Sequence, residues 1–141
     1  MKILIPVDGS SGANRAVEYA IGSVVWLKEA PQVLLLNVQW KLASGNIKLF
    51  INKETVNDYY REQGMSALAE ARAKLEASGL AYGYHISVGS PAEAIVQYAK
   101  EQGADQIVMS AHGQDKLSNL LLGSVATKVT QLTSVPILLI K

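Results

Sequence analysis

Five short apolar runs, separated by helix-length segments, constrain the fold of this chain more than any other feature of its sequence. Strands that alternate with helices predict βαβ units and a parallel sheet. Several runs are apolar at consecutive positions, which is typical of strands covered by helices on both faces. We therefore predict an α/β fold with a five-stranded parallel sheet. The expected strands are residues 2–7, 32–38, 81–88, 106–110 and 135–140.

Four segments between these runs carry helical signals. The first has apolar residues at three-four spacing, and Ser10 or Ser11 precedes it as a candidate cap. The third has the most complete signals, with Ser90 as its cap, Pro91 in its first turn and Gly103 after its end. The expected helices are residues 13–25, 54–78, 90–103 and 124–132.

Length, charge and cysteine content exclude several classes of function. A chain of 141 residues has the length of one domain, which we expect to cover residues 1–141. Thirteen Lys and Arg against twelve Asp and Glu leave no basic excess for nucleic-acid binding. No cysteine is present for disulfides or thiolate metal sites. The N-terminal run has five apolar residues before Asp8, too few for a signal peptide or a membrane span, so we expect a cytoplasmic protein.

Residues 40–53 follow the second run and fit no period. We predict a long surface loop with Trp40 and Phe50 as its testable residues. Such a loop serves as a binding lid or partner surface, or it is simply variable, because loops tolerate insertion.

Two of the runs end in residues suited to holding a ligand. The first ends in PVDGSSG, which places Asp8 beside glycines and hydroxyls, and the fourth ends in SAHG. Ligands of open parallel sheets bind beyond the carboxyl ends of neighbouring strands. If these two strands are neighbours, Asp8 and Gly113 face one crevice. Glycine lets backbone N–H groups approach a phosphate, and the helix beginning at Ser124 offers free N–H groups beyond Gly123.

The spacing of these residues resembles a known family rather than the common phosphate motifs. No glycine-lysine-Ser/Thr of a Walker loop and no glycine-x-glycine of a dinucleotide fingerprint occurs. The universal stress protein family carries glycine, two residues, glycine, nine residues, glycine and then serine or threonine in its ATP-binding members. Here the last three positions are Gly113, Gly123 and Ser124. MKILIPVDGS, LLLNV, GSPAEAIVQYAKEQGADQIVMSAHG, LLLGSVATKV and SVPILLIK extend the resemblance over almost the whole chain.

The resemblance implies a three-layer α/β/α sandwich of the flavodoxin-like, adenine nucleotide α-hydrolase-like type, with strand order 3-2-1-4-5. It also implies an ATP site in which Asp8 contacts the ribose or magnesium, Val38 packs on adenine, and Ser124 holds the phosphates. The full set of implied nucleotide-binding residues is Pro6, Val7, Asp8, Val38, Met109, Ser110, His112, Gly113, Gln114, Gly123, Ser124 and Val125.

One position departs from the family pattern, because Ser110 stands where the first glycine is expected. A left-handed backbone there would cost a residue with a side chain about 1–2 kcal/mol. The resemblance implies an ATP-binding regulator or sensor in the stress response, with at most slow ATP hydrolysis. The alternative is a nucleotide-free stress protein that acts by dimerisation and partner binding. In either case the C-terminal strand, an edge strand on the family's order, predicts a homodimer.

Overall fold

The five strands form one parallel sheet of order β3-β2-β1-β4-β5, as predicted. The computed structural model describes residues 1–41, 53–113 and 122–141. Four of the five strands differ from their predicted bounds by one or two residues at one end. The strands are β1 (Lys2–Pro6), β2 (Gln32–Gln39), β3 (Tyr82–Val88), β4 (Gln106–Ser110) and β5 (Ile137–Ile140).

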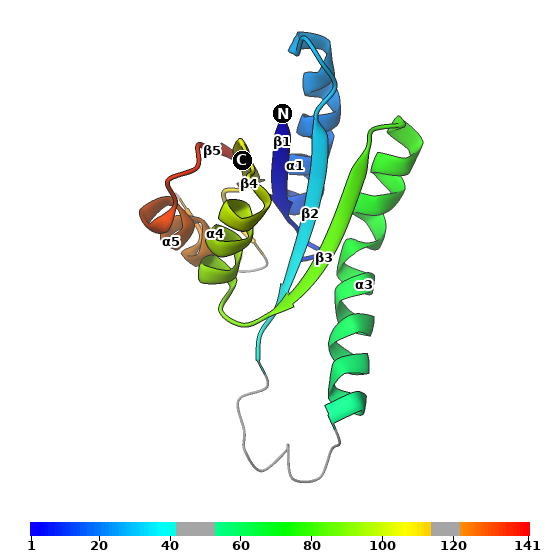
Figure 1. The fold of residues 1–141 in the computed structure, drawn as a ribbon, viewed down its shortest axis with the longest axis vertical. Helices are drawn as coiled ribbons and strands as arrows, with labels where there is room; N and C mark the ends of the chain where they lie inside the picture. Colours follow the sequence, from blue (N-terminus) through cyan, green and yellow to red (C-terminus); the bar gives the residue numbers. More distant parts are fainter. Residues whose placement is uncertain (42–52, 114–121) are drawn as a thin grey trace.

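The helices cover both faces of this sheet and complete a three-layer α/β/α fold (Figure 1). Helices α1 and α3 pack on one face, and α4 and α5 pack on the other. Helix α3 approaches β3 closely at Gly64, where an added Cβ would lie 2.7 Å from Ile86 Cδ1. The helices are α1 (Ser11–Ser23), α3 (Lys53–Ser78), α4 (Pro91–Gln102) and α5 (Ser124–Leu132), and a 3₁₀ turn, η1 (Val24–Trp26), follows α1.

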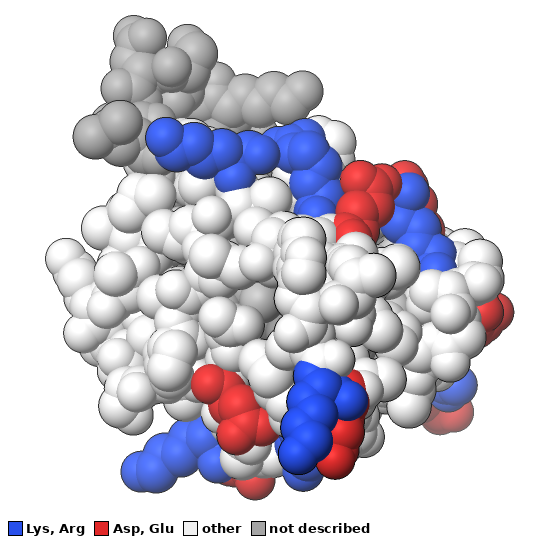
Figure 2. Space-filling view, turned by 90° about the horizontal axis from the view of Figure 1, so that it is seen from above, with Lys and Arg blue, Asp and Glu red and all other residues white. Residues whose placement is uncertain are grey.

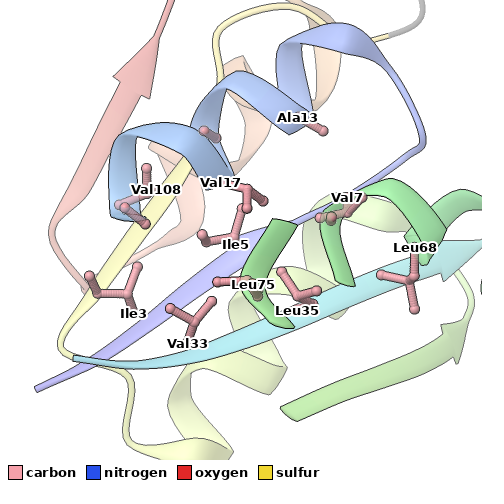
Figure 3. Close-up of a cluster of buried hydrophobic side chains, with 13 residues drawn as sticks. Ile3, Ile5, Val7, Ala13, Val17, Val33, Leu35, Leu68, Leu75 and Val108 are labelled. Atoms are coloured by element: carbon pink, nitrogen blue, oxygen red, sulfur yellow. The ribbon is translucent and has the colours of Figure 1, made fainter. Parts of the chain in front are cut away.

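Alternating residues of each central strand divide between two hydrophobic cores. On one face, Ile3 and Ile5 of β1 and Val33 and Leu35 of β2 pack against α1 and α3 (Figure 3). On the other face, Leu4 of β1 packs with its neighbours against α4 and α5. Because successive side chains of a strand point to opposite faces, the nearly continuous apolar runs are explained by burial on both sides.

At the ends of two helices, apolar residues of the predicted helical pattern are exposed, and one of these helices ends earlier than predicted. The apolar pattern of residues 13–25 continues past the α-helix, which ends at Ser23, and Val25 in the 3₁₀ turn is 82% exposed. Leu132 at the end of α5 is also exposed. An apolar pattern identifies one face of a helix but does not reveal whether another element covers that face. Ser10 is the cap of α1, since its Oγ accepts a hydrogen bond from Ala13 N.

The view from above relative to Figure 1 shows a broad surface without Lys, Arg, Asp or Glu (Figure 2). Basic and acidic side chains lie beside one another around its margin rather than in a patch of one sign. Among the described residues, no helix has the length and apolar character needed to cross a bilayer.

Candidate functional site

A cavity of about 550 Å³ opens at the carboxyl ends of β1, β2 and β4. The strand order reverses between β1 and β4, which pair directly, so the connections leaving these two strands diverge. Ligand sites of open α/β sheets lie at this kind of position, and the volume falls within the range of small-molecule sites. The lining residues are Pro6, Val7, Asp8, Ala13, Leu36, Asn37, Val38, Gln39, Trp40, Tyr59, Tyr60, Pro91, Ile95, Met109, Ser110, Gly113, Ser124, Val125 and Ala126.

The turn after β1 places a carboxylate at the mouth of this cavity. Gly9 has a φ of 85°, which favours glycine, and it turns the chain into α1. Asp8 Oδ1 accepts a hydrogen bond from Ser10 N at 2.9 Å. The exposed carboxylate is therefore held by the same turn that starts the helix.

The SAHG turn after β4 brings Gly113 against this carboxylate. A Cβ built on Gly113 would lie 2.7 Å from Asp8 Oδ2. Gly113 is not among the described glycines with positive φ, so close approach rather than backbone conformation calls for glycine here. The crevice between Asp8 and Gly113 that adjacency of β1 and β4 predicts is therefore present.

The start of α5 closes the same side of the cavity. Gly123 N donates to Ala111 O at 2.7 Å, which fixes the beginning of the helix against the turn after β4. A Cβ at Gly123 would lie 3.3 Å from Ala111 O and 3.4 Å from His112 Cα. Ser124 and Val125 follow in the first turn of α5, where backbone N–H groups have no partner within the helix and point outward.

Ser110 does not adopt the left-handed backbone for which a penalty was predicted. It is the last residue of β4, and no described residue other than glycine has a positive φ. Its hydroxyl donates to His112 O and accepts from His112 N, so the serine closes the turn that carries Gly113. The side chain points toward α1, where Gly12 leaves room for it: a Cβ at Gly12 would lie 2.2 Å from Ser110 Oγ.

The β2 side of the cavity contains polar residues that the sequence analysis did not single out. Asn37 is 3% exposed, and its Nδ2 donates to Val7 O at 2.9 Å. Its Oδ1 accepts from Gln39 Nε2 at 2.6 Å. Polar residues at alternate positions near the end of an apolar strand were the available signal. Tyr60 is buried and Tyr59 exposed, and both line the cavity.

The structure brings most of the residues proposed from sequence into one lining. Two others, His112 and Gly123, lie beside the lining in the turns just described, and Gln114 lies outside the described residues, as do Phe50 and most of the 40–53 segment. The proposed residues within the lining are Pro6, Val7, Asp8, Val38, Met109, Ser110, Gly113, Ser124 and Val125.

An ion pair holds α5 against α4 beside the cavity. Lys128 Nζ lies 2.6 Å from Glu93 Oε1. The hydrogen bond from Lys128, together with one from Ser90, holds the pKa of the Glu93 carboxyl below its usual value of 4.5. The Lys128 ammonium is thus engaged by a carboxylate of this chain.

The family model for the universal stress protein family matches residues 1–141. The chain belongs to the universal stress protein family. Universal stress protein MJ0531 of Methanocaldococcus jannaschii is 31% identical over 99% of this chain and 81% of its own length. A solved structure of MJ0577 from the same organism is 30% identical, with a TM-score of 0.84 over 99% of this chain and 94% of the other.

The universal stress protein fold also recurs at lower identity. A universal stress protein family protein of Arabidopsis thaliana, solved with AMP bound, is 21% identical, with a TM-score of 0.71 over 100% of this chain and 91% of the other. At this identity the likeness concerns the fold, which agrees with the α/β sandwich and strand order described above.

Proposed function

We propose that this universal stress protein binds an adenine nucleotide, with ATP as the ligand, and acts as a regulator or sensor in a stress response. The observation that carries the proposal is the cavity at the β1–β4 reversal, lined by residues of the family's nucleotide motif. The AMP-bound Arabidopsis thaliana relative supports an adenine nucleotide as the class of ligand.

The proposed ligand runs from β2 to α5. Val38 packs on the base, and Pro6, Val7 and Met109 form the neighbouring wall. The Asp8 carboxylate binds a ribose hydroxyl or one face of a magnesium ion, since Mg²⁺ takes one or two carboxylates together with phosphate oxygens. Ser110 and His112 shape the turn. Gly113, Gly123, Ser124 and Val125 face the phosphates, where the helix N-terminus attracts negative charge. Gln114, outside the described residues, stays a candidate from sequence for the ribose and phosphates.

The alternative is a nucleotide-free stress protein that works through dimerisation and partner contacts. The close approaches at Gly113 and Gly123 favour the nucleotide, because they hold Asp8 and the α5 N-terminus at one opening of the cavity. Nucleotide analysis of the purified protein after denaturation distinguishes the two functions.

We further propose that the protein holds ATP without rapidly consuming it. Fast phosphoryl transfer needs fixed metal ions, cations at the γ-phosphate and a group that orients water. Lys128, in the helix that begins at the proposed phosphate end, is paired with Glu93. Turnover at about 1 s⁻¹ or faster would place the protein among ordinary enzymes and contradict the sensor proposal.

A homodimer through β5 completes the proposal. The carbonyl groups of Pro136 and Ile140 accept hydrogen bonds from Ile107 of β4 and from Ala111 just after it. The backbone groups of Leu139 therefore face the opposite edge. Leu139→Pro removes an outward N–H, whereas Leu139→Ala shortens the side chain and keeps that N–H. We expect light scattering to report a dimer for the wild type and Leu139→Ala and a monomer for Leu139→Pro; a monomeric wild type contradicts the dimer.

Calorimetric titration with ATP and GTP in magnesium buffer tests the nucleotide site directly. We expect ATP to bind more tightly than GTP, and ATP to raise the melting temperature. If millimolar ATP gives neither heat nor a shift in melting temperature, the protein acts as the nucleotide-free alternative. Alanine at Asp8 should weaken ATP binding, with the exposed Asp105 at the far end of the sheet as a matched position.

A further inference from the structure

We propose that Gln39 reads the amino group at position 6 of the base, so that this side chain selects adenine over 6-oxopurines. The inference rests on the proposed adenine-nucleotide function and assigns base specificity to a residue outside the family's nucleotide motif. It follows from a chain of two hydrogen bonds that fixes which atom of the Gln39 amide is left for a ligand.

This series of hydrogen bonds begins at a group that can only be an acceptor. Val7 O is a backbone carbonyl and can only accept, so the Asn37 atom facing it at 2.9 Å must be the amide nitrogen. The Oδ1 atom of Asn37 must then face Gln39. Since that oxygen can only accept, the Gln39 atom at 2.6 Å must be Nε2.

The remaining polar atom of the Gln39 amide is Oε1, a hydrogen-bond acceptor. Among the described residues, no hydrogen bond to this oxygen is present, and the half-buried Gln39 is one of the residues that line the cavity. A carbonyl there accepts from the amino group of adenine, which is the pairing that glutamine makes with adenine in other settings. It repels the oxygen at position 6 of hypoxanthine or guanine.

The amide cannot easily turn over to suit a 6-oxopurine. A flipped Gln39 would place its oxygen against Asn37 Oδ1, and Asn37 cannot flip in turn without facing Val7 O with an acceptor. Asn37 is almost fully buried. The Gln39 backbone is held as well, because it pairs with Val88 of β3 and its carbonyl accepts from Gly89 N at 2.9 Å. Selectivity thus depends on a fixed amide orientation.

Three nucleotides that differ at position 6 test the inference on the wild-type protein. ATP carries the amino group, purine riboside triphosphate carries hydrogen, and ITP carries oxygen. We expect affinity to fall in that order, with ITP at least about tenfold weaker than ATP. Equal affinity for the three would overturn the role of Gln39 while leaving nucleotide binding in place; binding of none would overturn the proposed function and this inference together.

Gln39→Met gives the matching variant, because methionine keeps the length of the side chain and lacks the acceptor. We expect it to bring ATP and purine riboside triphosphate to the same affinity and to lower the ITP/ATP ratio of dissociation constants by about tenfold. Gln32→Met, at the exposed opposite end of β2, is the control and should keep the wild-type ratio. A wild-type ratio in Gln39→Met would refute the inference, and the wild-type ligand series decides the matter even if that variant does not fold.

Discussion

The two ends of the cavity are built in opposite ways. The glycine end (Gly12, Gly113 and Gly123) depends on missing side chains, because a Cβ at each position would press on Ser110, Asp8 or the Ala111 carbonyl. The amide end (Asn37 and Gln39) depends on side chains that are present and hydrogen-bonded. The first should therefore fail when a methyl group is added, and the second when a polar group is removed.

The largest effect is expected at Gly12. In Gly12→Ala the new methyl group would lie 2.2 Å from Ser110 Oγ and 2.9 Å from His112 O. We expect the free energy of unfolding to fall by about 3 kcal/mol, at the upper end of overpacking costs. Urea denaturation measures the loss. Gly22→Ala in the same helix meets nothing within 4 Å and should be neutral or slightly stabilising.

A second variant shows whether Ser110 causes this loss. Ser110→Gly in the Gly12→Ala background removes the atom that the methyl group meets first, although His112 O remains. We expect partial recovery of stability. If Gly12→Ala is as stable as Gly22→Ala, the glycine end does not depend on empty space.

The next largest effect is expected at the amide end. Asn37→Leu leaves Val7 O and Gln39 Nε2 without their partners. We expect a loss of about 2 kcal/mol in the free energy of unfolding, the cost of unsatisfied buried polar groups. Gln32→Leu on the exposed end of β2 is the control. Equal urea midpoints for the two variants would show that the amide end is not held by these bonds.

Gly113→Ala separates binding from stability at the glycine end. Its methyl group would meet the Asp8 carboxylate, whose exposed side chain can move. We expect stability to change little and ATP affinity to fall about tenfold, or about 1.4 kcal/mol. In an Asp8→Ala background the same substitution should have no further effect. If Gly113→Ala still causes the full loss of ATP affinity in that background, contact with Asp8 is not the cause of the loss.

The smallest effect is expected for the Glu93–Lys128 ion pair, which belongs to neither end of the cavity. Because Lys128 lowers the pKa of Glu93 below 4.5 in the folded state, the pair stabilises the fold above pH 4.5 and loses this effect as the pH falls through the folded value. We expect Lys128→Met to lower the melting temperature slightly at pH 7 and by progressively less as the pH falls below 4.5. A pH-independent difference would argue against the ion pair.

The difference between the two ends of the cavity also explains which of their residues could be predicted from sequence. The apolar runs predicted the strands, and the PVDGSSG and SAHG segments predicted that Asp8 and Gly113 follow two of them, because local patterns encode these features. Strand order came from the family resemblance. The alternating polar residues at the end of β2 mark Asn37, but they do not reveal its role, because its partner, Val7 O, lies 30 residues away in sequence. The left-handed backbone considered for Ser110 was wrong, since Ser110 is the last residue of β4 and only glycines have a positive φ among the described residues.

The contact between Ser110 and Gly12 has an evolutionary consequence. Positions 12 and 110 share one small volume, so a lineage can carry a side chain at either position but not comfortably at both. A chain with serine at position 110 must first have glycine at position 12, and a chain with glycine at position 110 is free to diversify position 12. Substitutions at these two sites, nearly a hundred residues apart in sequence, should therefore arise in a fixed order and co-vary among relatives.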